Sequence, residues 1–236
     1  MLVAAAVCPS PPLLVPEVAE GAAPELDALR AACLDAVAVL AAARPERLVV
    51  VGPAGPDAAG TYPQGAPGSF RGLGVDLDVR LGDGGPAGER RLPQSLTVAA
   101  WLLTRTAWSA APVTGLGVAQ SLGTDECLAA GRALVGTGER VALLVMGDGS
   151  ACRTVKAPGY LDERAEPFDK LAARALGAAD TAALAGLDAE LAGELQAAGR
   201  APWQVLAGAA GEAALRGALL YEDAPYGVGY FVAAWS

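Results

Sequence analysis

The chain of 236 residues contains no histidine. Histidine is the commonest metal-binding side chain and the only one whose ordinary pKa lies near neutral pH. Its absence excludes a Ser-His-Asp triad, a Cys-His catalytic pair and any zinc or iron site built on imidazole. The sequence therefore restricts the chemistry of the protein before any motif is considered.

Positive charge is also scarce, because the formal net charge is −9 and only two residues are lysines, Lys156 and Lys170. No basic run is present. An acidic chain of this kind is a poor partner for nucleic acid or for an anionic membrane surface, and we expect neither.

Long apolar runs are missing as well, since no stretch of about 18 uninterrupted apolar residues suggests a membrane span. The first residues, MLVAAAVCPSPPLLVPE, lack a positively charged segment, and prolines follow the apolar run at once. They predict a buried first strand rather than a secretory signal. We therefore expect a cytoplasmic protein without a membrane segment.

What the chain has is apolar residues, which make up 53% of it and suffice for a sizeable core. The four cysteines, Cys8, Cys33, Cys127 and Cys152, form no C-x-x-C pair. We expect them to be buried as small hydrophobic side chains.

Strand-like apolar runs alternate along the chain with helical patterns. Strands are predicted at residues 2–7, 47–52, 74–81, 113–119, 140–146 and 227–235, and helices at 24–43, 92–110, 125–135, 166–176, 181–184, 189–198 and 202–210. Long loops are expected at 53–74, 82–91 and 151–164. No repeat or linker interrupts this order, which predicts one α/β domain over residues 1–236. Its fold is expected to be a three-layer α-β-α sandwich around a largely parallel or mixed sheet.

Unusual residues follow three of the predicted buried strands. These segments are Cys8-Pro9-Ser10-Pro11-Pro12, Gly52-Pro53-Ala54-Gly55-Pro56 and Gly147-Asp148-Gly149-Ser150. Ligands of open α/β sheets bind beyond the carboxyl ends of the strands. We therefore expect the three segments to converge on one cleft.

Five segments in this order resemble the LigB-like family of class III extradiol ring-cleavage dioxygenases, which also includes Memo-like proteins. They are CPSPPLLVPE, RLVVVGPAG, MGDGSACR, APGYLDERAEPFD and GRAPWQVLAGAAG. None is diagnostic alone, but together they cover nearly the whole chain. The resemblance implies the fold of that family.

The resemblance also implies a metal held by two histidines and a carboxylate or cysteine, with a further histidine as acid or base. Those positions fall on Ser10, on Ala54 or Gly55, on Ala151 and near Ala198. None carries a strong metal-binding side chain, and a facial iron site needs two imidazoles. We therefore expect no dioxygenase activity, no metal and no cofactor.

Polar residues remain after the strongest predicted strand. Asp148 and Ser150 lie on a glycine-flanked turn that could present backbone N–H groups to an anion, or could be a capped turn only. Lys156 could be a buried base or electrophile, or a solvated charge. With Tyr160 and Arg164, it could instead form a lid or a dimer contact.

Two further sites are conceivable. A nucleophilic Ser10 would need Lys156 as its base, because no histidine is available. Cys8 and Cys152 could hold zinc together with Asp148, although no third soft ligand is apparent.

The last third of the chain adds two candidates. Arg200 could pair with Asp148 or bind a ligand carboxylate or phosphate, or lie at the surface beside a core Trp203. Tyr226 belongs to a cluster of tyrosines that could pack at the sheet, form a subunit interface or stack on a ligand.

Three hypotheses for function follow. The first is a metal-free binding protein on a LigB-like scaffold, which holds a small ligand or a partner protein in the cleft where that family binds its metal. Its candidate ligand residues are Ser10, Gly55, Asp148, Ser150, Ala151, Lys156, Arg200 and Tyr226. The second is a metal-independent enzyme for a small anionic metabolite, using Asp148, Ser150 and Lys156. The third is a homodimeric assembly protein with the C-terminal tyrosines at its interface.

Overall fold

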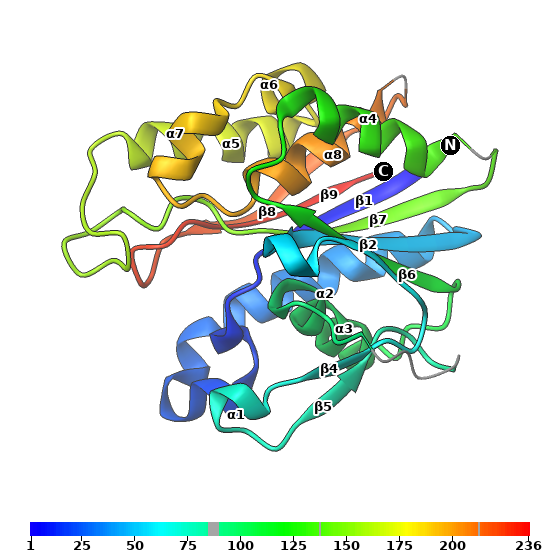
Figure 1. Ribbon diagram of the computed structural model, residues 1–236, viewed down its shortest axis with the longest axis horizontal. Coiled ribbons are helices and arrows are strands. Elements are labelled where there is room, and N and C mark those ends of the chain that lie inside the picture. The colour runs from blue at the N-terminus through cyan, green and yellow to red at the C-terminus, as the bar shows by residue number, and fades with distance from the viewer. Residues whose placement is uncertain (85–89, 137, 212) are drawn as a thin grey trace.

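The computed structural model describes residues 1–84, 90–136, 138–211 and 213–236. A seven-stranded sheet with the strand order β3-β6-β2-β7-β1-β9-β8 forms its centre (Figure 1). The strands are β1 (Leu2–Cys8), β2 (Arg47–Ala54), β3 (Gly60–Tyr62), β6 (Val113–Ala119), β7 (Val141–Met146), β8 (Gly217–Asp223) and β9 (Tyr230–Trp235). The β1, β2, β6 and β7 strands run parallel, whereas β3, β8 and β9 are antiparallel to their neighbours.

The parallel strands are continuous apolar runs because helices cover both faces of the sheet. Alternate residues of β1 enter opposite cores: Ala4 and Ala6 face one, Ala5 and Val7 the other. This confirms the predicted α/β class with helix layers on either side of a mixed sheet.

One helix layer consists of α2 (Asp27–Ala42) and α3 (Gln94–Arg105). The opposite layer holds α4 (Thr124–Val135), α5 (Ala165–Ala178), α6 (Thr181–Ala185), α7 (Ala189–Glu194) and α8 (Arg200–Ala210), as Figure 1 shows. The α4 and α8 helices cross closely: a Cβ built on Gly131 would lie 2.0 Å from the carbonyl oxygen of Val205. Glycine is therefore needed where these two helices touch.

Shorter elements complete the fold. Between β1 and α2 lie the helical turns η1 (Pro12–Leu14), α1 (Pro16–Ala19) and η2 (Glu20–Leu26). After β2 come η3 (Pro56–Ala58), β4 (Pro67–Ser69), η4 (Arg71–Leu73) and β5 (Asp78–Arg80). The β4 and β5 strands pair as a separate hairpin that contacts α3. Within the described parts of the chain, no helix is both long enough and apolar enough to cross a bilayer.

Three sequence predictions need correction. The segment 53–74 is not a plain loop, because it holds β3 and β4, and the strand predicted at 74–81 is shorter, at Asp78–Arg80. The β8 strand was missed: it is an edge strand that is largely exposed, so its residues lack the alternation of a half-buried strand. Of the loop predicted at 82–91, residues 85–89 lie outside the described residues.

Candidate functional site

The turn after β7 lies between the end of β1 and the start of α8. The Gly147 N–H donates to the Cys8 carbonyl at 3.0 Å, and the Gly199 N–H donates to the Asp148 carbonyl at 2.8 Å. A Cβ on Gly147 would lie 2.5 Å from Cα of Gly199, so only glycine fits there. The carboxyl ends of β1 and β7 therefore meet the first turn of α8 at Asp148.

The Asp148 side chain is half-buried in this turn. Its Oδ1 accepts a hydrogen bond of 2.7 Å from the Ser10 backbone N–H. Burial raises the pKa of this carboxyl to about 6, although the Ser10 N–H opposes the shift. Oδ2 has no hydrogen-bond partner among the described residues, yet it is not one of the fully enclosed polar atoms without a partner, so it retains access to solvent.

Two further groups, Tyr230 and Cys33, lie close enough to Asp148 for its charge to affect their pKa. Burial, followed by the charge of Asp148, raises the pKa of the Tyr230 hydroxyl at the start of β9. Burial also raises the pKa of the Cys33 thiol on α2. A hydrogen bond with Cys8 and the negative charge of Asp148 raise it further. We call these residues, with Ser10, the strand-end cluster: Cys8, Ser10, Cys33, Asp148 and Tyr230.

Besides the Ser10 hydroxyl, which is also without a hydrogen-bond partner among the described residues, Tyr230 is the group of this cluster that can form further hydrogen bonds. Its side chain is buried, and its hydroxyl has no hydrogen-bond partner within the described ranges. Among the described residues, the strand-end cluster thus has a carboxyl oxygen, a phenol and the Ser10 hydroxyl without a partner from the protein.

Ser150 lies only two residues beyond Asp148 but faces a different environment. Its backbone N–H and its hydroxyl both donate to Asp169, at 2.7 and 2.8 Å, and its side chain is completely buried. The Asp169 carboxylate on α5 also accepts a bond of 3.2 Å from Arg153. Ser150 therefore anchors the turn to α5, and its hydroxyl proton is not available to a ligand.

Lys156 is exposed on the segment 151–164, and its ammonium group has no partner among the described residues. No hydrogen bond joins it to Ser10 in the described part of the chain, so the Ser10–Lys156 dyad receives no support from the geometry. The side chain of Lys156 is thus a solvated charge.

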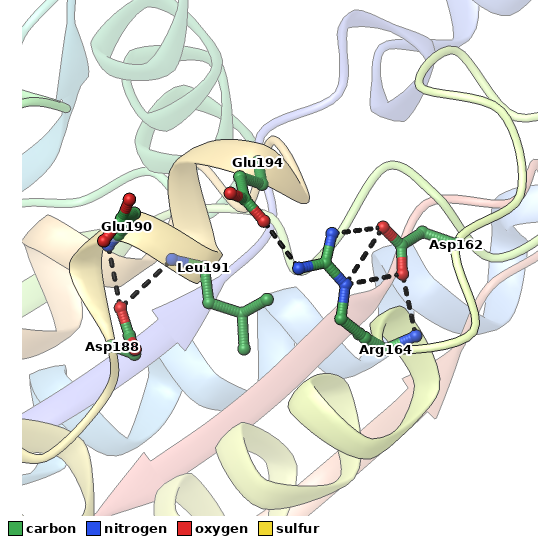
Figure 2. A network of polar contacts seen from close by, with 6 residues as sticks. All are labelled: Asp162, Arg164, Asp188, Glu190, Leu191 and Glu194. Atoms are coloured by element: carbon green, nitrogen blue, oxygen red, sulfur yellow. Dashed lines mark hydrogen bonds and ion pairs between the residues drawn. The ribbon is translucent and has the colours of Figure 1, made fainter.

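The segment 151–164 is fastened to α7 by Arg164, as Figure 2 shows. Its guanidinium bonds to Asp162 and to Glu194, each at 2.6 Å. Hydrogen bonds from Arg164 lower the pKa of Asp162 to about 2. In the same view, Asp188 caps the first turn of α7 by accepting from Glu190 and Leu191. Arg164 thereby fixes the loop, while Tyr160 is 64% exposed beside it.

Arg200 was predicted either to contact Asp148 or a ligand, or to lie at the surface. It is buried instead, and its guanidinium donates to the carbonyl of Leu122 at 2.7 Å, to the carbonyl of Gln120 and to Gln204 at 3.0 Å. No ion pair joins it to Asp148 among the described residues. Arg200 supports the loop after β6, while Trp203 lies in the core as expected.

The remaining ligand candidates are spread along the same edge of the sheet. Gly55 is exposed and lines a cavity of about 330 Å³ with Ala54 and Ala119. Ala151 is buried and donates its N–H to the Leu195 carbonyl. Tyr226 is half-buried, and its hydroxyl donates to Glu25 at 2.8 Å. The structure thus brings Ser10 and Asp148 into contact, whereas Gly55 lies beside a separate cavity.

The zinc site considered for Cys8, Cys152 and Asp148 does not form. Cys8 and Cys152 belong to the two cores on opposite faces of the sheet, and the Cys152 thiol donates to the Leu195 carbonyl. Within the described residues, no group of three His, Cys, Asp or Glu side chains is arranged to hold a metal ion.

The sequence interpretation missed Asp169 and Arg153 and treated Cys33 only as buried core, whereas Tyr230 belongs to the tyrosine cluster considered for a ligand. Asp169 carried a usable signal, because it lies on the apolar face of α5, one residue after Phe168 and three before Ala172. An acidic residue on such a face needs buried partners. Cys33 gave no such signal, since a cysteine on an apolar helix face is ordinary core.

No model of a known protein family matches the sequence, and no curated protein matches it significantly. Among solved structures, the chain is similar to the uncharacterized protein JW3007 from Escherichia coli K12. The two share 13% sequence identity and a TM-score of 0.59, over 99% of each chain. At this identity the likeness concerns the fold alone.

Proposed function

We propose that this chain is a binding protein on a LigB-like scaffold whose metal site has been lost, and that it holds a small ligand at the strand-end cluster. The observation that carries the proposal is Asp148, a half-buried carboxyl at the carboxyl ends of β1 and β7 with one backbone donor and one open oxygen. An oxygen that no described protein group satisfies and that solvent can reach is a position where a ligand donor can bind.

The chemistry of the ligand follows from the open groups. Above pH 6 Asp148 is ionised and accepts hydrogen bonds, which favours an ammonium, amide or hydroxyl group on the ligand. The phenol of Tyr230 stays neutral and can donate to a ligand oxygen. A small polar molecule that carries both kinds of group satisfies both residues.

The proposal includes no dioxygenase step. The positions that the resemblance assigns to metal ligands and to the acid/base are Ser10, Ala54 or Gly55, Ala151 and the neighbourhood of Ala198, and the sequence supplies no imidazole. Metal analysis of protein purified without chelator tests this point. We expect far less than one metal ion per chain, and stoichiometric iron or zinc would contradict the proposal.

The enzymatic alternative has weaker support. It needs Asp148, Ser150 and Lys156 to act together on an anionic metabolite, but the Ser150 hydroxyl is bonded to Asp169 and Lys156 is exposed. We therefore rank it below ligand binding.

A homodimer is the second candidate that a specific observation favours. The β8 strand lies at the edge of the sheet and exposes Leu219 and Leu220. Exposed apolar edge strands are ready to pair with another chain. Light scattering at micromolar concentration tests this, and a monomer would count against it. A dimer and a ligand site are compatible.

A thermal-shift screen of small polar metabolites at pH 8 tests the binding proposal. A ligand that binds only the folded state raises the melting temperature. We expect this increase to disappear in Asp148→Asn and to persist in Asp35→Asn, because Asp35 is exposed on α2. Equal increases in both variants would place the ligand elsewhere.

A further inference from the structure

A second cavity, of about 680 Å³, lies outside the helix layer of α2 and α3. It is bounded by the β4–β5 hairpin, by the last turns of α3 and by Glu17 of α1; Figure 1 shows the hairpin beneath α3, on the side away from the sheet. Its volume is typical of a site for a small molecule. It shares no lining residue with the strand-end cluster.

Four arginines line this cavity in a chain whose net charge is −9. The guanidinium of Arg71 already has two acidic partners, Asp76 at 2.7 Å and Asp78 at 2.8 Å. Arg80 makes one long hydrogen bond of 3.4 Å to the Gly65 carbonyl. Arg91 and Arg105 have neither a hydrogen bond nor an ion pair with any described residue.

Of the described acidic side chains that line the cavity, Asp78 pairs with Arg71, and the other two leave the remaining arginines without an ion pair. Glu17 and Asp83 also line it, but among the described residues neither lies within ion-pair distance of Arg80, Arg91 or Arg105. Within the described residues, three guanidinium groups thus line one cavity without a carboxylate partner, and an anion that enters it can pair with them.

The floor of the cavity is apolar. The side chains of Trp101 and Val79 are buried there, with exposed fractions of 6% and 8%. Guanidinium groups bind phosphate through two parallel hydrogen bonds, and they bind it better than lysine does. The cavity thus offers charged donors at its rim and an apolar surface below them.

We propose that the cavity between the β4–β5 hairpin and α3 binds a small organic phosphate, with Arg80, Arg91 and Arg105 on the phosphate and the surface of Trp101 and Val79 beneath the organic part. This site is independent of the strand-end cluster. Each site can fail without affecting the other.

Titration calorimetry of the whole chain with inorganic pyrophosphate, at low ionic strength, tests this proposal. We expect saturable binding of one pyrophosphate per chain. Arg91→Gln combined with Arg105→Gln should weaken it at least about tenfold, because each lost charge-assisted bond contributes roughly that factor. Arg105→Lys keeps the charge but loses the planar guanidinium group. Its affinity for pyrophosphate should therefore lie between those of the unmodified protein and the double variant.

Arg174→Gln is the matched control, because Arg174 is exposed on α5 and has no ion pair with a described residue. We expect its pyrophosphate affinity to equal that of the unmodified protein. Unchanged affinity in the double variant would overturn the proposal, as would equal losses in the control. Binding of citrate without binding of pyrophosphate would overturn the phosphate assignment. Melting temperatures within a few degrees of the unmodified protein establish that all variants are folded.

Discussion

Asp148 lies in the turn after β7 and Asp169, on α5, bonds to Ser150 of the same turn, yet the hydrogen bonding of the two carboxyls differs. The carboxylate of Asp169 is completely buried and accepts from the N–H and the hydroxyl of Ser150 and from Arg153. Among the described residues, the carboxyl of Asp148 accepts from one N–H, that of Ser10, and its other oxygen has no partner.

Burial raises the pKa of both carboxyls, so the pKa alone does not distinguish them. What distinguishes them is how many partners the protein provides. A carboxylate with all its partners supplied by the fold holds elements together, whereas one that is left open fits a ligand site. Four substitutions test this difference, from the largest expected effect to the smallest.

Asp169→Ala should be the most destabilising substitution. It leaves the two buried donors of Ser150 without their acceptor and removes one partner of the half-buried Arg153, which still has Glu166 at 4.0 Å. Each buried donor left without a partner costs about 1–3 kcal/mol, so the two donors of Ser150 together give a loss of roughly 2–6 kcal/mol. Urea denaturation at pH 7 measures the loss, and a loss below about 1 kcal/mol would show that Asp169 does not anchor the turn.

Asp148→Asn should instead stabilise the protein. An amide can still accept from the Ser10 N–H, but it carries no charge that burial penalises. The pKa of Asp148 is about 6 in the folded state against an ordinary value of 3.8. This difference corresponds to a gain in the free energy of unfolding of at most about 3 kcal/mol at high pH.

The pH dependence gives this prediction its sign. Below pH 4 the carboxyl is protonated in both the folded and the unfolded state, so the substitution should have little effect on the free energy of unfolding. Between about pH 4 and 6 the folded state keeps its proton longer, so the native protein loses stability as the pH rises. The gain from Asp148→Asn should therefore develop over this range and be complete at pH 8. Urea denaturation at pH 4, 6 and 8 measures it, with Asp35→Asn as the exposed control.

Ser150→Ala should cost about 2 kcal/mol, since it removes a buried hydrogen bond to a charged acceptor. The backbone bond from Ser150 to Asp169 remains, so the loss should be smaller than that of Asp169→Ala. Thermal unfolding compares the two. Equal losses would mean that the hydroxyl carries most of the anchoring.

Tyr230→Phe should change stability by less than about 0.5 kcal/mol, because its hydroxyl has no partner among the described residues. The same substitution should weaken the binding of any ligand that requires Asp148. A loss of stability as large as that of Ser150→Ala would indicate a structural partner for this hydroxyl.

Much of the scaffold could be predicted from the sequence. The strand Val113–Ala119 has the predicted bounds, because apolar runs between turn residues define buried strands. The turn carrying Asp148 was also identified, since glycines mark the end of β7. The edge strand β8 was missed because its stability comes from pairing with β9 and packing on α5, not from its own pattern.

The candidate site could be predicted only in part. Contact between Ser10 and Asp148 follows from the rule that parallel strands end at one edge. The partners Cys33 and Tyr230 come from a helix and an antiparallel strand far along the chain, and no local pattern reports such contacts. Arg200 and Ser150 were plausible ligand residues by type, but their hydrogen bonds to the protein itself show another use.

The most direct test of the central claim is an NMR titration of the Asp148 side-chain carboxyl, assigned by its loss in Asp148→Asn. We predict a pKa of about 6, which falls when a ligand donor binds to the open oxygen. A pKa near the ordinary 3.8 would mean that this carboxyl is fully solvated or already satisfied, and it would contradict the assignment of Asp148 as an open ligand-binding group.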